Sequence, residues 1–107
     1  MRIAKKPDGR VVFVEIGNER SGWQHIKKNH ANDFVNRGIS EDQILDAVMT
    51  AVVNGRILGI QGRSRSIYQV EFNSITQYIS VDVGSNGYIV SANPTPQKLI
   101  RRFTLEE

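Results

Sequence analysis

The apolar residues of this chain change their spacing at Asn54-Gly55, and that change limits the folds the chain can adopt. Before it, apolar side chains recur at helical spacing at Ile44, Leu45, Ala47, Val48, Ala51 and Val52. Ser40 followed by Gln43 has the form of a capping box, and Gly55 suits the left-handed conformation that follows a helix. After Gly55 the apolar residues alternate, as they do in strands. We therefore predict an amphipathic helix over 40–54, followed by a sheet.

Short segments after this helix predict an antiparallel meander, in the ranges 57–60, 66–72, 75–83 and 88–92. Asn73-Ser74 provides one turn between them. Asn86-Gly87 provides another, because Asn-Gly favours the primed turns of hairpins. We expect Asn93-Pro94-Thr95-Pro96 to end the sheet, since proline lacks the N–H that an interior strand donates to its neighbour. The polar residues 61–65 predict a flexible loop.

The first third of the chain adds a strand and a helix. Residues 11–16 predict an opening strand after the Pro7-Asp8-Gly9 turn, and residues 23–37 favour a helix. The tail, 97–107, is expected to be exposed or loosely docked. With 107 residues and no internal linker, the chain is predicted to be a single domain, residues 1–107. Its expected class is α+β, with N-terminal helices packed on an antiparallel sheet.

The composition narrows the classes of function. The chain has 14 Lys and Arg against 11 Asp and Glu, and this mild basic balance fits a polyanionic partner such as RNA. It has no Cys, which excludes disulfides, thiolate metal sites and a Cys nucleophile. No apolar run approaches the roughly 20 residues that span a bilayer, and the start of the chain lacks the apolar stretch of a signal peptide. Export would then depend on a signal elsewhere, on a larger parent chain.

The two histidines, His25 and His30, are the strongest candidates for chemistry. A zinc-binding helix places two His four positions apart with a Glu between them, so their spacing of five disfavours a metal site. General acid–base catalysis suits them better, because imidazole titrates near neutral pH and can take or give a proton. On a straight helix the two side chains would point about 140° apart. We therefore expect the helix to bend or end near His30; the alternative is that one or both His are structural.

Cations and polar groups that could bind a phosphate lie further along the chain. Arg63 and Arg65 flank Ser64 in the predicted loop, and arginine can hold a phosphate with two parallel donors. The alternative is that these charges are merely solvated. Tyr68 could stack on a base, donate to the phosphate or half-bury in the sheet. The amide of Asn93 and the hydroxyl of Thr95 close the last strand, where they could bind a phosphate oxygen or form an ordinary turn.

Several segments together resemble a known family. They are the residues from Gly22 to His30, then Arg37-Gly38-Ile39-Ser40, Asn54-Gly55-Arg56-Ile57, Tyr68-Gln69-Val70, and the residues from Asn86 to Pro94. Across about residues 22–96 the chain resembles the C-terminal toxin domains of bacterial polymorphic and contact-dependent growth inhibition systems. These domains belong to the barnase/EndoU/colicin/RelE-like ribonuclease superfamily.

The resemblance implies a twisted antiparallel sheet that carries the RNA cleft, and RNA cleavage without metal or other cofactor. The expected substrate is RNA, often tRNA, cut to leave 2′,3′-cyclic phosphate ends. By this likeness His25, His30, Arg63, Arg65 and Thr95 are the expected catalytic residues. The expected RNA-binding residues are Lys28, Tyr68 and Asn93.

The resemblance also implies a biological setting. Such a toxin is delivered from a secreted or cell-surface parent protein into the cytoplasm of a target bacterium. A cognate immunity protein neutralises it, and the toxin is otherwise expected to be a monomer. The alternative is a non-catalytic RNA- or protein-binding module of the same fold, in which the His pair is structural. A role as the immunity partner itself is disfavoured by the basic charge.

Overall fold

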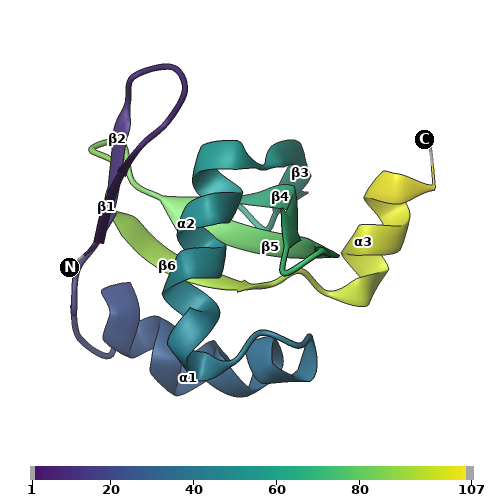
Figure 1. Cartoon of the computed structure of the whole chain (residues 1–107), viewed down its shortest axis with the longest axis horizontal. Helices are drawn as coiled ribbons and strands as arrows, with labels where there is room; N and C mark the ends of the chain where they lie inside the picture. The colour runs from purple at the N-terminus through teal and green to yellow at the C-terminus, as the bar shows by residue number, and fades with distance from the viewer. Residues whose placement is uncertain (1, 106–107) are drawn as a thin grey trace.

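The computed structural model describes residues 2–105 and contains both helices and strands (Figure 1). Its strands β1 to β6 have the bounds Arg2–Lys5, Val11–Val14, Arg56–Gln61, Arg65–Phe72, Ile75–Val83 and Ile89–Pro94. Its helices are α1 (Gly22–Asn36), α2 (Ile44–Asn54) and α3 (Gln97–Thr104), with a 3₁₀ turn, η1 (Glu41–Gln43), before α2. None of these helices combines the length and the apolar character needed to cross a bilayer.

The class is α+β, but the helices are not N-terminal as the sequence predicts. The described chain begins with an antiparallel hairpin of β1 and β2, and it ends with α3. The main sheet is antiparallel with the strand order β3-β4-β5-β6. Strand β1 escapes sequence prediction because its four residues carry no periodic pattern of their own and are defined by pairing with β2. A single parallel bridge between Phe13 and Tyr88 links β2 to the start of β6.

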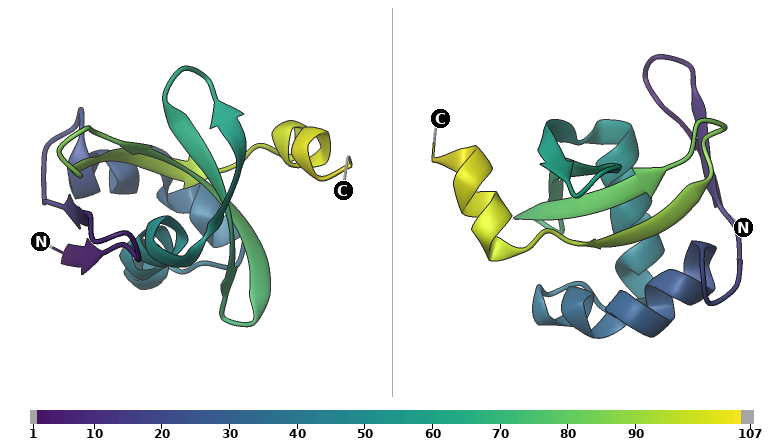
Figure 2. Two further views of the ribbon diagram at one scale, coloured as in Figure 1. Left: turned by 90° about the horizontal axis from the view of Figure 1, so that it is seen from above. Right: turned by 180° about the vertical axis from the view of Figure 1, so that it is seen from behind.

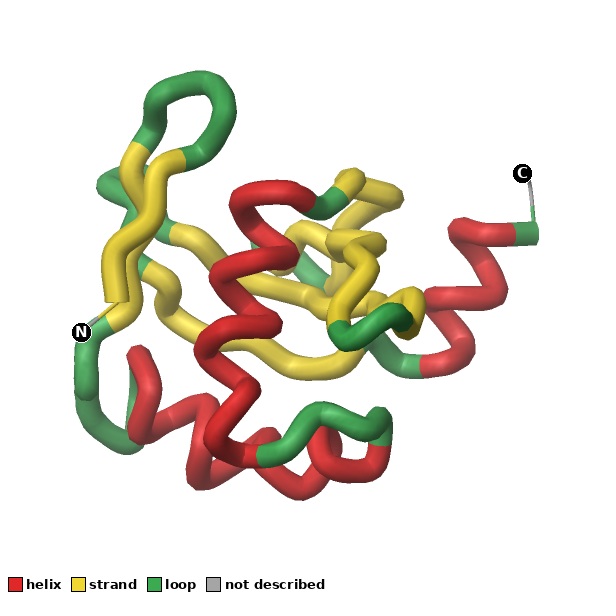
Figure 3. Tube along the Cα trace, in the orientation of Figure 1, coloured by secondary structure: helices red, strands yellow, loops and turns green. Residues whose placement is uncertain are grey.

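Helix α2 covers one face of the main sheet, packing on β4 and β5 (Figure 2). The buried side chains that the main sheet contributes to the apolar cluster are Tyr68, Val70, Ile79, Val81, Ile89 and Ala92. A short loop after α1 leads into η1 and α2 (Figure 3), and buried Ile39 in that loop joins the same cluster. Because side chains alternate along a strand, Arg65, Ser80 and Asn93 point from the opposite face of the sheet.

Both ends of the helix predicted over 40–54 differ in detail from the prediction. The Ser40 side chain bonds no backbone N–H; its hydroxyl lies 2.5 Å from the Asp42 carboxylate, and the 3₁₀ turn η1 comes before α2. Gly55 is not left-handed, because its φ is −75°. Glycine is favoured at this position because there is no room for a side chain. A Cβ would collide with the Ala51 carbonyl oxygen and lie 3.1 Å from Cβ of Tyr68.

The hairpin turns are assigned differently from the sequence prediction. The primed turn is Asn73-Ser74, where φ is 54° and 63°. At Asn86-Gly87 only Gly87 has a positive φ, 93°, so the prediction of a primed turn there is wrong. The sheet ends where the sequence predicts: Pro94 is the last residue of β6, where it pairs with Ile79, and the edge position of β6 tolerates proline.

Two segments are more ordered than the sequence suggests. Gln61 and Arg65 are not loop residues; they pair as the last residue of β3 and the first of β4. The tail from residue 97 forms α3, which packs on β3 by placing the Phe103 ring over Gly59, where a Cβ would lie 2.6 Å from the ring. Glu106 and Glu107, the end of the predicted tail, lie outside the described residues.

Helix α1 packs lengthwise against β6 and is tied to that strand near both ends. Near its start, the Ser21 hydroxyl lies 3.0 Å from the Tyr88 hydroxyl. After its last turn, Arg37 Nη2 donates to the Thr95 carbonyl at 2.8 Å. Fifteen helical residues extend about 22 Å, and the strand from 88 to 95 covers about 23 Å, so the lengths match. This alignment sets the positions of the His side chains beside the sheet.

We predict that Gly22→Ala destabilises the fold more than Gly38→Ala. Both glycines have left-handed backbone, with φ of 79° and 84°, so alanine costs about 1–2 kcal/mol at either for that reason alone. Only at Gly22 would the new Cβ meet neighbours, 2.7 Å from the Tyr88 hydroxyl and 2.9 Å from the Glu15 carbonyl. Urea unfolding should show an extra loss of about 1–3 kcal/mol at Gly22. Equal losses in the two variants would contradict this packing of α1.

Candidate functional site

A cleft of about 440 Å³ lies where α1, the β3–β4 hairpin and the end of β6 meet. Its lining is predominantly polar and consists of His30, Asp33, Asn36, Arg37, Gln61, Arg65, Asn93, Pro94 and Pro96. Residues from four separate parts of the chain therefore converge here. Of the residues predicted for the site, the structure brings His30, Arg65 and Asn93 together in this cleft, with His25 beside His30.

Helix α1 runs without interruption from Gly22 to Asn36, so the expected bend or end near His30 is wrong. The two imidazole rings nevertheless meet, with centroids 5.8 Å apart and planes at 78°. The splay of about 140° applies to the directions in which the side chains leave the helix. Each ring extends beyond its Cβ, and the two lean toward each other. The helix therefore does not need to bend to bring the pair together.

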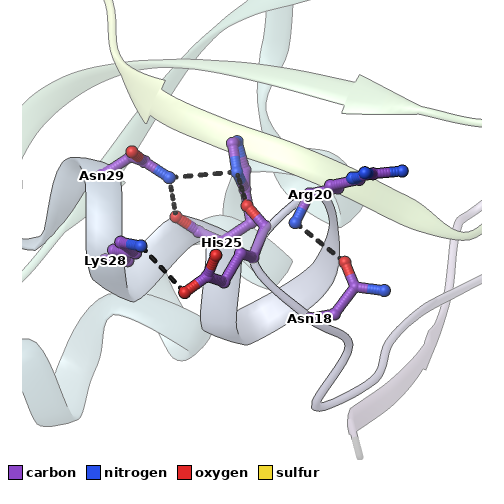
Figure 4. Close-up of polar contacts among 6 residues, drawn as sticks. Asn18, Arg20, His25, Lys28 and Asn29 are labelled. Carbon is purple, nitrogen blue, oxygen red and sulfur yellow. Dashed lines mark hydrogen bonds and ion pairs between the residues drawn. The ribbon is translucent and has the colours of Figure 1, made fainter.

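His25 is held through its Nδ1 atom (Figure 4). Nδ1 lies 2.9 Å from the Glu19 carbonyl oxygen, which can only accept, so Nδ1 carries the hydrogen in that bond. The Asn29 amide, 3.1 Å from Nδ1, instead donates to the His25 backbone carbonyl at 3.0 Å. This arrangement leaves Nε2 as the nitrogen that can exchange a proton with a substrate.

His30 is half-buried, with 21% of its side chain exposed. Burial lowers the pKa of His30 from its ordinary value, and the positive charges of Arg65 and His25 lower it further. Asp33, whose carboxylate lies 3.6 Å from His30 Nδ1, acts in the opposite direction. The net direction is down, so His30 is neutral, and able to accept a proton, over a wider range below neutral pH than a free imidazole.

A chain of polar contacts fixes the floor of the cleft. Arg65 Nη1 donates a short hydrogen bond to Asn93 Oδ1, and Asn93 Nδ2 donates to Gln61 Oε1 at 3.2 Å and to the Pro94 carbonyl at 2.8 Å. The orientation of the Asn93 amide is defined, because its nitrogen faces two acceptors, Gln61 Oε1 and the Pro94 carbonyl, and its oxygen faces the donor Arg65. Asn93 thus orients Arg65, whose remaining donors are available to an anion in the cleft.

Sequence reasoning overlooked Arg37, Asp33 and Gln61. Arg37 lies in the cleft and donates to the Thr95 carbonyl, while its own carbonyl accepts from Gln77 Nε2 at 2.9 Å. Asp33 could have been found from its spacing, since positions 30 and 33 share a helix face. Arg37 and Gln61 carry no local signal, because only the packing of α1 and the hairpin against β6 brings them to the cleft.

Thr95 and Tyr68 lie away from the cleft. Thr95 is fully buried, and its hydroxyl is 2.8 Å from the hydroxyl of Ser80, so this group does not face a phosphate. Tyr68 points into the apolar cluster under α2, and burial raises the pKa of its phenol. The sequence could not assign its face, because Ile67 and Tyr68 are both apolar and adjacent. Neither side chain contributes to the cleft in the predicted way.

The two remaining predicted residues are exposed and outside the cleft lining. Lys28 pairs with Glu19 at 2.9 Å, and this contact holds the pKa of the Glu19 carboxyl below its ordinary value. Arg63 lies in the β3–β4 turn, exposed and two residues from Arg65. Among residues 2–105, no group of three or more His, Asp or Glu side chains could hold a metal ion.

Comparison with known proteins adds no family to this description. No protein-family model matches the chain, and no curated protein matches it. The function must therefore be argued from the site itself.

We predict that Asp33 and Arg65 shift the pKa of His30 in opposite directions. Asp33→Asn removes the neighbour that favours imidazolium, so the pKa should fall below that of the parent protein. Arg65→Gln removes a positive charge, so the pKa should rise. The ring proton signals of His30, followed by NMR against pH, measure both shifts. Movement of the two variants in the same direction would contradict the geometry.

We predict that Thr95→Val lowers stability by about 1–3 kcal/mol, because Ser80 loses its buried partner while the shape is kept. Thr76→Val in β5 is the matched control: its hydroxyl donates to the Glu71 carboxylate at the exposed surface, so its loss should change the free energy of unfolding by no more than about 0.5 kcal/mol. Denaturant unfolding measures both. A loss of stability no larger than that of the control would show that the contact between the Thr95 and Ser80 hydroxyls does not stabilise the fold.

Proposed function

We propose that this protein is a metal-independent endoribonuclease that cleaves RNA by attack of the 2′-hydroxyl on the adjacent phosphate. The observation that carries the proposal is the contact of two imidazoles, 5.8 Å apart, at a polar cleft that also contains Arg37 and Arg65. In this reaction a bond forms between the 2′-oxygen and phosphorus, and the bond from phosphorus to the 5′-oxygen breaks. One group must remove the 2′ proton and another must protonate the 5′-oxygen.

His30 is proposed as the base. Its burial and its cationic neighbours lower its pKa, so the neutral form that accepts a proton is favoured near neutral pH. The carboxylate of Asp33, 3.6 Å from Nδ1, orients the ring and stabilises the imidazolium that forms when the proton arrives. His30 also lines the cleft directly, within reach of a bound phosphate.

His25 is proposed as the acid. The Glu19 carbonyl accepts from Nδ1 of this ring and fixes its orientation. In the doubly protonated ring, Nε2 can give its proton to the departing 5′-oxygen. After one turnover His25 is neutral and His30 is charged. Exchange with water restores both, so neither metal nor cofactor is needed for the proton balance.

Arg65 and Arg37 are proposed to stabilise the charge that builds on the phosphorane. Both line the cleft, and Asn93 and the Thr95 carbonyl orient them before substrate binds. Thr95 thus acts through its backbone carbonyl, by holding Arg37. From the resemblance in sequence we also propose the finer assignment to the barnase/EndoU/colicin/RelE-like fold, with a toxin role, tRNA as substrate and a cognate immunity protein; the α+β class is compatible with this assignment.

We predict that the purified protein cleaves RNA in the presence of EDTA and leaves 2′,3′-cyclic phosphate ends. His25→Ala and His30→Ala should each lower kcat by about 10²–10⁴-fold, since each removes one proton-transfer group. Asn32→Ala, on the exposed surface of the same helix, is the matched control and should retain full activity. Full activity in both His variants would refute the proposal, and so would a parent protein that cleaves no RNA.

Induced expression in bacteria separates the toxin role from the non-catalytic alternative. If the protein is a ribonuclease toxin, the parent chain should stop growth and degrade RNA, and the two His variants should do neither. If it is a binding module only, the parent and the double His variant should have equal effects on growth, with total RNA intact in both.

A further inference from the structure

Helix α3 has two sharply different faces. Leu99, Ile100 and Phe103 are half-buried, and the Phe103 ring rests over Gly59 of β3. Lys98, Arg101 and Arg102 are exposed and, at spacings of three and four, share the other face. The helix therefore uses its apolar side to dock on the sheet edge and presents its cations to solvent.

The cations of α3 are not neutralised by the part of the chain that the structure describes. Within residues 2–105 the ion pairs involve Arg2, Arg10, Lys27, Lys28 and His30, and none involves Lys98, Arg101 or Arg102. A row of cations on one helix face, with no ion pair among residues 2–105 and held in place by docking of the opposite face, is suited to a partner with regularly spaced negative charges.

The basic face continues from the cleft. Pro96 lines the cleft and directly precedes α3, and β3, on which α3 docks, ends at Gln61 in the cleft lining. Figure 2 shows α3 standing out from the edge of the sheet, away from the α2 layer. Eight helical residues extend the surface by about 12 Å beyond the cleft, the reach of a few nucleotides.

We propose that Lys98, Arg101 and Arg102 of α3 form a second RNA-binding surface, which contacts backbone phosphates of the substrate beyond the cleft. This inference rests on the proposed function, since it takes RNA as the polyanion. The surface would bind phosphates without reading bases, because its three side chains are exposed cations and contacts to phosphates carry no sequence information. Its role is to bind a long or folded RNA and to direct one strand into the cleft.

An anionic membrane is the other polyanion that a basic amphipathic helix can meet. Membrane binding needs the apolar face to enter the lipid, and here that face is engaged by β3, with Phe103 over Gly59. The exposed residues of α3 are polar or charged: Gln97, Lys98, Arg101 and Arg102. The observations therefore favour RNA.

The test compares two triple variants that each remove three positive charges. The first is Lys98→Gln/Arg101→Gln/Arg102→Gln. The control is Lys5→Gln/Lys6→Gln/Arg10→Gln in the β1–β2 hairpin, far from α3 in Figure 1. The probe is a 2′-O-methyl RNA stem-loop, which cannot be cleaved because it lacks the 2′-hydroxyl. Binding is measured across a range of salt concentrations, and circular dichroism checks that both variants fold.

The α3 variant should bind the probe at least about tenfold more weakly at low salt, and the slope of log affinity against log salt should flatten by about 2. The control should keep the parent affinity and slope. If the α3 variant matches the control, the inference is overturned. It is also overturned if the α3 variant keeps its affinity for RNA but loses binding to vesicles containing phosphatidylglycerol. If the parent protein binds the probe through α3 but cleaves no RNA, the ribonuclease proposal fails and the α3 surface stands.

Discussion

The lengthwise packing of α1 against β6 is the constraint on which the rest of the site depends. The helix is tied to the strand at one end by Ser21 and Tyr88, and at the other by Arg37 and the Thr95 carbonyl. Between these points its length leaves no freedom to slide along the strand by a helical turn without breaking both contacts. His30 is therefore placed opposite the end of β6, where Arg65 has been oriented by Asn93.

That placement also explains the electrostatics of the pair. A histidine at the same position on an isolated helix would be solvated, with only Asp33 near it. Docking on β6 removes water from His30 and brings Arg65 near, and both effects oppose Asp33. His25 is held by a carbonyl that precedes the helix, outside this enclosure. One helix thus gives two identical side chains different surroundings, which is what a paired acid and base require.

Elements with strong local periodicity could be predicted from the sequence, and those defined by long-range contacts could not. Strand β5 has the bounds of the predicted range 75–83, because alternation runs through all of it. Strand β1 needs its partner to be recognised, and α3 has a clear amphipathic pattern that is only eight residues long. The same division holds in the site. The two His can be picked out from the sequence because of their chemistry, whereas Arg37 becomes part of the cleft only through the tertiary fold.

Thr95 shows why residue type alone misleads at a strand end. A hydroxyl after Asn-Pro is a reasonable phosphate ligand, but its direction depends on the alternation of β6 and on what lies behind the strand. Here the hydroxyl points inward to Ser80, and only the carbonyl reaches the cleft side, through Arg37. At Thr95 the contribution to the cleft is therefore carried by the backbone carbonyl, whereas the side chain stabilises the fold through Ser80. Asn93, two residues earlier, differs because its amide itself bonds Arg65, so there the side chain cannot be exchanged without changing how the arginine is held.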